Sequence, residues 1–258
     1  MNCLRLHNGH EIEYRLIGAP SEETPTLVFL HEGLGSVSLW RDFPDRLARA
    51  CGLPGLVYSR YGYGRSTPFE PPPGIDFMHT AARDELPAVL AAVGVGPAVL
   101  VGHSDGASIA LVHAGESGAP PLAVVAMAPH LFVEPICIEA IAATTAGFDT
   151  SGLRERLGRH HLDAARTFGG WSGVWLSGGF PAWSIEAQVA RIRCPVFAIQ
   201  GSRDQYGTMR QIHRIAELAP DTMLLELPGV RHSPHLECTE HLVAVVSGWL
   251  RCRLARSE

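Results

Sequence analysis

The sequence predicts an α/β fold built on a mostly parallel sheet, with a helical insertion in its second half. Short apolar runs of the kind found in buried strands alternate with helix-compatible segments along most of the chain. Such alternation is typical of βαβ units and a parallel sheet. The alternation stops at about residue 131 and resumes at about residue 190. An insertion at this point predicts a lid over the carboxyl ends of the strands, where such sheets bind ligands.

The amino-terminal half supplies the larger share of the expected strands. Residues 3–17 alternate around the turn dipeptide Asn8-Gly9, which predicts an antiparallel hairpin at the edge of the sheet. Apolar runs predict further strands at 26–30, 55–59, 98–101 and 122–127. Helices are expected between them at 43–50, at 78–93 despite Pro87, and from 107 onward.

The second half begins with the insertion and then returns to the strand–helix pattern. Helical segments at 136–146 and 151–167 are followed by two aromatic–glycine clusters at 168–175 and 180–183. A strand at 195–199, a helix at 208–218, a strand at 223–227 and a helix at about 238–252 complete the series. We therefore expect a core formed by 1–130 and 191–258, and a helical cap formed by 131–190.

Composition excludes several classes of protein. The 258 residues are 46% hydrophobic and 18% charged, which indicates a globular chain, and the net charge of −5 argues against nucleic-acid binding. All 21 basic residues are arginine. The lack of lysine excludes a Schiff base, a pyridoxal phosphate anchor and a P-loop lysine. Six cysteines without a Cys-x-x-Cys motif, no signal stretch and no membrane-spanning apolar run favour a cytoplasmic protein with reduced thiols.

The stretch Gly102-His103-Ser104-Asp105-Gly106 is the strongest indication of chemistry. It reads Gly-x-Ser-x-Gly between a predicted strand and a predicted helix. Glycines on both sides allow strand and helix to approach closely, and they allow the serine backbone a strained conformation. The helix then directs its free N–H groups at the serine hydroxyl. This pattern is that of a nucleophile elbow, with Ser104 as the nucleophile.

A serine hydroxyl needs a histidine to take its proton and a carboxylate to orient that histidine. Asp204 and His232 each follow a predicted strand, so both are expected at the edge of the sheet where Ser104 lies. Glu134 follows the preceding strand and is the alternative acid. The N–H groups of Gly33 and Asp105 are the expected donors to an oxyanion.

Other polar residues around these positions receive plainer interpretations. We expect His103 to pack and form hydrogen bonds, and we expect the Asp105 carboxylate to point away from the serine. His232, His235, Cys238 and His241 have spacings that arise often by chance, so the sequence predicts no metal site. The Gly-x-Gly within residues 60–65 lacks the third glycine of a dinucleotide fingerprint and predicts a structural turn.

Five motifs together resemble the α/β-hydrolase superfamily over nearly the whole chain. They are His31-Glu32-Gly33-Leu34-Gly35, Gly62-Tyr63-Gly64-Arg65-Ser66, Gly102-His103-Ser104-Asp105-Gly106, Gly201-Ser202-Arg203-Asp204 and Arg231-His232. The resemblance implies an eight-stranded sheet with a cap, and no cofactor. Two residues depart from the usual motifs, because Glu32 and Arg231 stand where glycine is common. Glu32 could bind a substrate cation or hydroxyl, or form a salt bridge with an arginine, which is the interpretation we favour.

These observations predict a serine hydrolase that cleaves a carboxylic ester or related acyl bond through an acyl-serine intermediate. The scaffold also supports thioesterases, lactonases, carbon–carbon bond hydrolases and cofactor-free haloperoxidases. A non-catalytic small-molecule-binding protein is the alternative from a different class. Trp171, Trp175 and Trp183, with Glu32, are candidate substrate contacts, and the tryptophans favour an apolar or aromatic small molecule. We expect no nucleic-acid or membrane partner, and a monomer or homodimer.

Overall fold

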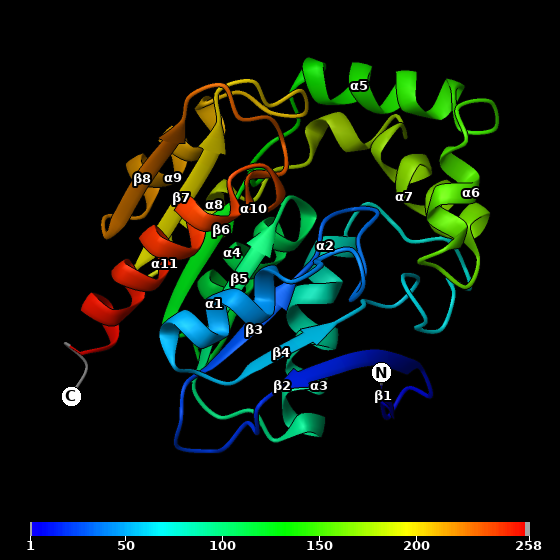
Figure 1. Ribbon diagram of the computed structural model, residues 1–258. Coiled ribbons are helices and arrows are strands. Elements are labelled where there is room, and N and C mark those ends of the chain that lie inside the picture. The colour runs from blue at the N-terminus through cyan, green and yellow to red at the C-terminus, as the bar shows by residue number, and fades with distance from the viewer. Residues whose placement is uncertain (1, 256–258) are drawn as a thin grey trace.

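The computed structural model describes residues 2–255 and contains one eight-stranded sheet, in the order β1-β2-β4-β3-β5-β6-β7-β8 (Figure 1). The strands are β1 Asn2–Arg5, β2 Glu11–Ile17, β3 Thr26–Leu30, β4 Gly55–Tyr58, β5 Ala98–His103, β6 Ala123–Met127, β7 Val196–Gly201 and β8 Thr222–Leu227. β2 runs antiparallel to β1 and to β4, and the other neighbouring strands are parallel. The predicted mostly parallel sheet and its amino-terminal edge hairpin are confirmed.

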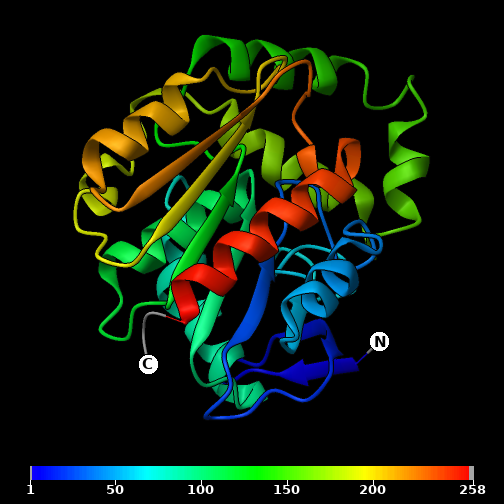
Figure 2. The ribbon, with the colours of Figure 1, turned by 60° about the vertical axis from the view of Figure 1, so that its left-hand side comes forward.

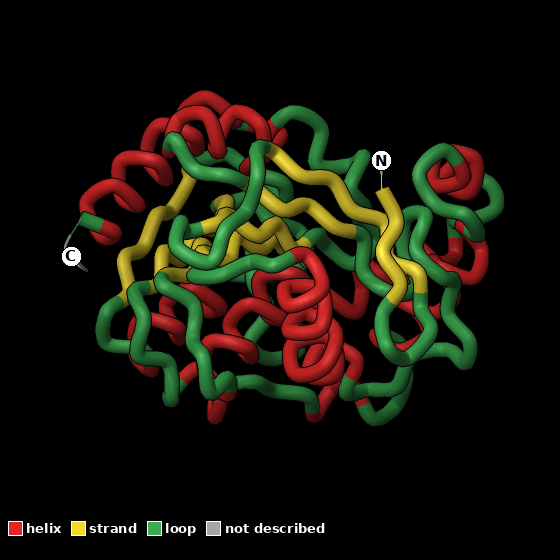
Figure 3. Tube along the Cα trace, turned by 90° about the horizontal axis from the view of Figure 1, so that it is seen from below, coloured by secondary structure: helices red, strands yellow, loops and turns green. Residues whose placement is uncertain are grey.

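Helices cover both faces of the sheet. In Figure 3 the strands lie between two helical layers. The core on one face includes α1 Phe43–Cys51 and α11 Thr239–Leu254, which lie side by side (Figure 2). The other face is covered by α3 Leu86–Val93, α4 Asp105–Glu116, α8 Glu186–Val189 and α9 Arg210–Leu218. This arrangement confirms the predicted α/β architecture.

Burial on both faces explains why the central strands read as continuous apolar runs. In β3, Leu27 and Phe29 pack into the core beneath α1 and α11, whereas Val28 and Leu30 pack into the core on the opposite face. All four side chains are fully buried. A strand with one solvated face would instead alternate apolar and polar residues.

One predicted helix contains a π-helical turn, and another is interrupted. The segment expected at 78–93 is helical throughout, as α2 Phe77–Thr80, a π-helical turn at Ala81–Glu85 and α3, with Pro87 in the first turn of α3. The segment expected at 151–167 divides into α6 Leu153–Gly158 and α7 Ala164–Trp175. Asp163 caps α7 by accepting a hydrogen bond from the Arg166 amide at 2.9 Å. The first aromatic–glycine cluster lies in the carboxyl-terminal half of α7.

The segment between β6 and β7 holds α5 Pro135–Ala146, α6, α7, the 3₁₀ turn Phe180–Ala182, α8 and their loops. In Figure 1, α5, α6 and α7 lie at the carboxyl-terminal side of the sheet, above the loops that follow the strands. Side chains of this segment bond to those loops. His161 accepts a hydrogen bond from the Gly64 amide at 2.8 Å and donates one to the Leu34 carbonyl at 3.0 Å. Thr167 donates to the Gly62 carbonyl at 2.7 Å.

Candidate active site

The turn between β5 and α4 holds Ser104 in an unusual backbone conformation. Its φ is 53° and its ψ is −121°, a region that non-glycine residues rarely occupy. A Cβ on Gly102 would lie 2.5 Å from the Ala107 Cα, and one on Gly106 would lie 2.0 Å from the Leu30 carbonyl oxygen. The two glycines therefore allow the contacts that hold Ser104 in this conformation, which is typical of strained functional sites.

Two backbone N–H groups are available near Ser104. The first intrahelical bonds of α4 run from the amides of Ala107 and Ser108 to the Ser104 carbonyl, so the Asp105 N–H precedes them and has no acceptor within the helix. Gly33 and Asp105 both line the pocket that contains Ser104. A Cβ at Gly33 would overlap the Trp171 indole nitrogen, at 2.1 Å, so only glycine fits between the loop and α7.

Arg60 and His31 fix the peptide that carries the Gly33 N–H. The Glu32 carbonyl of that peptide accepts hydrogen bonds from Arg60 Nη2 at 3.0 Å and from His31 Nδ1 at 2.7 Å. Arg60 also donates to the His31 carbonyl at 3.2 Å, and its guanidinium lies 4.5 Å from the centre of the Tyr63 ring. Because a trans peptide directs its C=O and N–H to opposite sides, these bonds set the direction of the Gly33 N–H.

Asp204 and His232 meet at the ends of β7 and β8. His232 Nδ1 lies 2.9 Å from Asp204 Oδ1 and 2.8 Å from Oδ2. Burial would raise the pKa of Asp204, but the hydrogen bonds from His232 and from the Tyr206 amide, together with the charge of His232, lower it below its usual value. An ionised Asp204 can only accept, so His232 carries its proton on Nδ1 and leaves Nε2 free to accept a proton.

Glu134, the alternative acid, has other partners. Its carboxylate accepts hydrogen bonds from the Thr208 amide at 2.9 Å, the Thr208 hydroxyl at 2.7 Å and Gln211 Nε2 at 2.8 Å. These bonds connect the start of α5 to the start of α9. The contact with His232 is therefore made by Asp204, and Glu134 joins the start of α5 to the start of α9.

Glu32 contacts a histidine, which corrects our expectation of an arginine partner. Its Oε2 lies 3.4 Å from His103 Nδ1, and this is the ion pair that the Glu32 carboxylate makes among residues 2–255. His103 Nε2 donates to the His232 carbonyl at 2.8 Å. Burial would raise the pKa of Glu32, but the hydrogen bond to His103 and the charges of the surrounding histidines hold it well below its usual value. His103 thus links Glu32 to the loop that carries His232, consistent with the hydrogen-bonding role predicted for it.

One pocket of about 170 Å³ is lined by Ser104 and His232 and also by Gly33 and Asp105. It is lined by Glu32, Gly33, Leu34, His103, Ser104, Asp105, His130, Cys137, Ile141, Trp171, Trp175, Tyr206, His232 and Ser233. Of the four candidate substrate contacts, the structure brings Glu32, Trp171 and Trp175 to this pocket. It does not bring Trp183 there, because that ring follows the 3₁₀ turn and stacks on Phe180, with centroids 5.5 Å apart.

The Asp105 carboxylate lies near the indole N–H groups of Trp175 and Trp171, two side chains of α7. Asp105 is only 1% exposed. Burial raises its pKa to about 6, although the charge of Arg60 and the indole N–H groups of Trp175 and Trp171 act in the opposite direction. Local sequence does not indicate this orientation, because the two tryptophans come from α7, some 65 residues further along the chain.

The sequence analysis also missed His130 and Tyr206. The His130 ring centre lies 6.1 Å from that of His232 and 5.0 Å from that of Trp175. Burial, with the charge of His232, lowers the pKa of His130 to about 3, so this ring is neutral at physiological pH. The Tyr206 ring lies 4.7 Å from that of His232. Both residues follow strands of the sheet, which is the only signal in the sequence that could have pointed to them.

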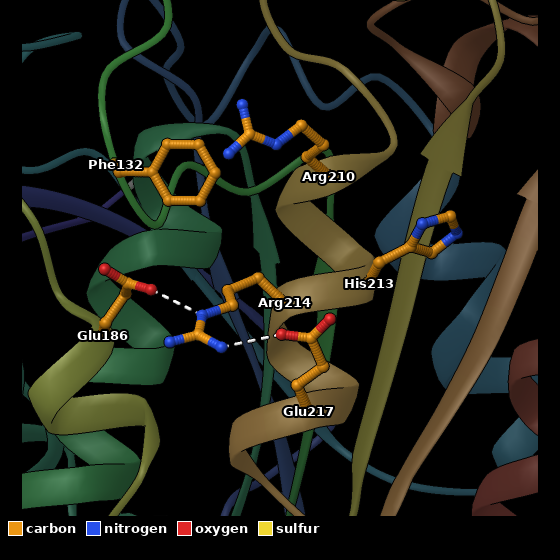
Figure 4. A pocket seen from close by; sticks show the side chains of 6 residues that line it. All are labelled: Phe132, Glu186, Arg210, His213, Arg214 and Glu217. Carbon is orange, nitrogen blue, oxygen red and sulfur yellow. Dashed lines mark hydrogen bonds and ion pairs between the residues drawn. The ribbon is translucent and has the colours of Figure 1, made fainter.

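A larger hollow of about 510 Å³ lies between α8, α9 and the loop after β6 (Figure 4). Its lining includes neither Ser104 nor His232. Arg214 pairs with Glu186 and Glu217, and Arg210 lies over the Phe132 ring at 5.4 Å.

Neither a metal-binding cluster nor a membrane-spanning helix is found within residues 2–255. Within residues 2–255, no group of three or more histidine, cysteine, aspartate or glutamate side chains has an arrangement that could hold a metal ion. His235 instead packs against Trp40, with ring centres 4.8 Å apart. Over the same residues, no helix has the length and apolar character that a membrane span requires.

The model of the alpha/beta hydrolase family matches residues 27–246. This chain belongs to the alpha/beta hydrolase family. Among solved structures, a carboxylesterase study of Nitrososphaera gargenis provides a chain with a TM-score of 0.79 and 20% identity, covering 99% of this chain and 100% of that one. The enol-lactonase from Burkholderia xenovorans LB400 has a TM-score of 0.75 and 19% identity, with 97% and 100% covered.

The curated relatives that match are longer than this chain. The mouse protein ABHD8 is 23% identical over 252 residues, which cover 89% of this chain and 56% of that protein. The chain thus spans about half the length of the ABHD8 proteins it matches. At these levels of identity the solved structures establish the fold, and the substrate must be argued from the pocket.

Proposed function

We propose that this protein is a serine hydrolase that cleaves a carboxylic ester or related acyl bond through an acyl-enzyme on Ser104. The observation that carries the proposal is the placement of a strained elbow serine in the same pocket as His232, whose Nδ1 lies 2.8 Å from Asp204. Family membership supports a hydrolase. The ester specificity and the role of each residue are our proposal.

In the proposed mechanism Ser104 Oγ attacks the acyl carbon while His232 Nε2 takes the hydroxyl proton. The ionised Asp204 orients the imidazole and stabilises the imidazolium that forms. The N–H groups of Gly33 and Asp105 stabilise the developing oxyanion, and the fixed direction of the Gly33 peptide makes that donor preorganised. His232 then gives its proton to the leaving alcohol, and water releases the acyl group by the same steps in reverse order.

The size of the pocket limits the substrate. At about 170 Å³ it is smaller than typical ligand pockets of about 300–1,000 Å³, which favours a short acyl group. Leu34, Ile141 and the tryptophan rings supply apolar walls. We propose that residues 131–190 act as a cap over the core, because α7 contributes Trp171 and Trp175 to these walls. A lactone is the second candidate substrate, and the structural similarity to an enol-lactonase favours it over the other bond types.

The proposal is tested by Ser104→Ala, assayed on a series of p-nitrophenyl esters and with a fluorophosphonate probe. The variant should lose both hydrolysis and labelling, and its melting temperature should stay close to that of the wild type because the hydroxyl contributes little packing. Ser151→Ala, which changes an exposed serine of the cap segment, is the matched control. Undiminished hydrolysis by the Ser104 variant would refute the mechanism. A wild-type protein that neither labels nor hydrolyses any ester would favour the non-catalytic binding protein.

A further inference from the structure

A hydrogen bond from His103 joins the elbow to the backbone of His232. The His232 carbonyl accepts from His103 Nε2 at 2.8 Å. The next peptide is held from within its own loop, because the Ser233 amide donates to Glu237 Oε1 at 3.3 Å. His103, in contrast, is the last residue of β5 and directly precedes Ser104. The bond from His103 therefore connects the backbone of the proposed base to the residue beside the proposed nucleophile.

The His103 ring is buried and tightly packed. Its side chain is 1% exposed. Its ring centre lies 4.6 Å from that of His235 and 6.5 Å from that of Trp40. A hydrogen bond in such surroundings is stronger than one for which water competes. The packing also restricts movement of the ring, so Nε2 keeps one position relative to the turn that carries Ser104.

Glu32 determines which way the His103 ring faces. Its Oε2 lies 3.4 Å from Nδ1, the nitrogen that does not contact the His232 carbonyl. A Cβ at Gly35 would lie 2.5 Å from the same carboxylate oxygen, so this glycine allows the loop after β3 to fold over the carboxylate. A carbonyl and an ionised carboxylate only accept hydrogen bonds, so the ring meets them with a proton on each nitrogen. A ring turned over about its Cβ–Cγ bond would present carbon atoms to both groups.

This connection bears on the proposed proton transfer from Ser104 to His232. Asp204 contacts the imidazole from the end of β7, so it orients the ring within the loops that follow β7 and β8. His103 instead fixes the backbone of His232 relative to the elbow. A displacement of about 1 Å between reacting groups can lower a rate about 100-fold. A bond that sets the separation of nucleophile and base therefore affects the rate more than it affects substrate binding.

We propose that His103, held by Glu32, is a positioning residue that places His232 beside Ser104 through the His232 carbonyl. The inference rests on the proposed function, because it assigns a role in the transfer of the Ser104 proton. On this proposal Glu32 acts through His103, and neither residue needs to touch the substrate.

Two substitutions of His103 separate its two contacts. His103→Gln keeps a nitrogen near the position of Nε2 and can still donate to the His232 carbonyl. His103→Asn keeps a nitrogen near Nδ1, which faces Glu32, and loses the donor to that carbonyl. We expect His103→Asn to lower kcat about 10- to 100-fold with KM unchanged, because the lost bond acts on proton transfer. His103→Gln should stay within about fivefold of the wild-type kcat, since a neutral amide forms a weaker bond than a charged ring.

Steady-state hydrolysis of p-nitrophenyl acetate measures these effects, with kcat referred to the fraction of protein that a fluorophosphonate probe labels. His113→Gln is the matched control, because His113 is a buried histidine in the last turn of α4 whose Nδ1 contacts the Ala82 carbonyl at 2.9 Å. It should lower the melting temperature and leave kcat unchanged. Equal kcat in the two His103 variants, or a loss that appears in KM alone, would overturn the positioning role.

Nitrogen-15 NMR of the Ser104→Ala protein tests the Glu32 contact without catalysis. Long-range correlations from the ring C–H groups report whether each ring nitrogen carries a proton. The His103 signals are those that disappear when His103→Asn is added. At pH 7 we expect protons on both nitrogens of His103, and we expect Glu32→Gln to leave one nitrogen unprotonated. An unprotonated Nδ1 beside an intact Glu32 would refute the role of Glu32 in holding the ring.

The two measurements distinguish this inference from the proposed function. Hydrolysis that depends on Ser104 but has the wild-type kcat in His103→Asn would refute the positioning role and leave the hydrolase proposal standing. A doubly protonated His103 in a protein that hydrolyses no ester would refute the hydrolase, and with it the positioning role, while the Glu32–His103 contact would stand.

Discussion

Replacing Asp204 by asparagine changes one carboxylate oxygen to the NH₂ of an amide, in a site where both oxygens accept hydrogen bonds. The carboxylate side chain is 1% exposed. Its Oδ1 accepts from the Tyr206 amide at 2.8 Å, and its Oδ2 accepts from Gln200 Nε2 at 2.7 Å. His232 Nδ1 lies within 2.9 Å of both oxygens. Each neighbour is therefore a donor, and an asparagine can accept on one side only.

Neither orientation of the new amide satisfies all of these donors. With its nitrogen in the position of Oδ2, the amide faces Gln200 Nε2 and presents a donor to His232, which favours the tautomer with the proton on Nε2. That tautomer cannot take the proton of Ser104. With its nitrogen in the position of Oδ1, the amide faces the Tyr206 N–H. Gln200 cannot rotate its amide freely to help, because its Nε2 also donates to the Gly207 carbonyl at 3.1 Å.

The expected losses follow from these contacts. Losing one hydrogen bond to a charged, buried group costs about 1.5–3 kcal/mol of stability. Loss of the orienting carboxylate in the serine-protease template, another enzyme, lowers kcat by about 10⁴-fold, and we expect a decrease of several orders of magnitude here. Steady-state hydrolysis of a p-nitrophenyl ester measures the rate, and circular dichroism with thermal melting measures the fold and its stability.

Glu134→Gln is the matched control for this prediction. It makes the same chemical change in a carboxylate that contacts Thr208 and Gln211. We expect it to lower stability by a similar amount and to change kcat far less. A crippled Glu134→Gln enzyme beside a mild Asp204→Asn enzyme would refute the assignment of the acid. It would leave the roles of Ser104 and His232 open.

Two further predictions concern the cap and a buried acid. Trp175→Ala should alter the ranking of kcat/KM among esters of different acyl chain length, because Trp175 lines the pocket. Trp183→Ala should change kcat/KM for all of these esters equally, because Trp183 stacks on Phe180 instead. Matching kcat/KM profiles of the two variants across the ester series would contradict the reasoning. Burial raises the pKa of Glu85 from 4.5 to about 7, so the folded state binds this proton more tightly than the unfolded state does, and stability should fall as pH rises from about 4.5 to 7. Glu85→Gln should remove about 1–3 kcal/mol of that fall in stability. Thermal melts of the wild type and the variant at pH 5 and pH 8 measure the difference. Identical pH profiles of the two proteins would show that Glu85 does not titrate in this range.

The order of strands and helices was predictable because it depends on local patterns. Continuous apolar runs marked the central strands, and burial on both faces by helices explains why these runs do not alternate. The turn at Asn8-Gly9 marked the edge hairpin. The π-helical turn at 81–85 and the break at 159–163 were not predictable, because the residues around them are compatible with a continuous α-helix.

Local sequence also determined which candidate residues lie near one another. Ser104, Asp204 and His232 each follow a strand of a parallel sheet, and the carboxyl ends of such strands share one edge. The contact between Asp204 and His232 agrees with this reasoning. Their catalytic roles stay predictions until the variants are measured.

Tertiary structure alone decided what lines the pocket. The carboxylate of Asp105 meets the indoles of Trp171 and Trp175 because α7 folds back over the end of β5, and nothing in the elbow motif specifies that approach. Glu32 contacts His103 rather than an arginine for the same kind of reason. The direction of a side chain depends on neighbours that are distant in sequence, whereas the strand that precedes it depends on residues beside it in the chain. The sequence by itself therefore determined the fold and the strand ends at which the candidate residues lie, and the packing of the segment 131–190 determined what surrounds them.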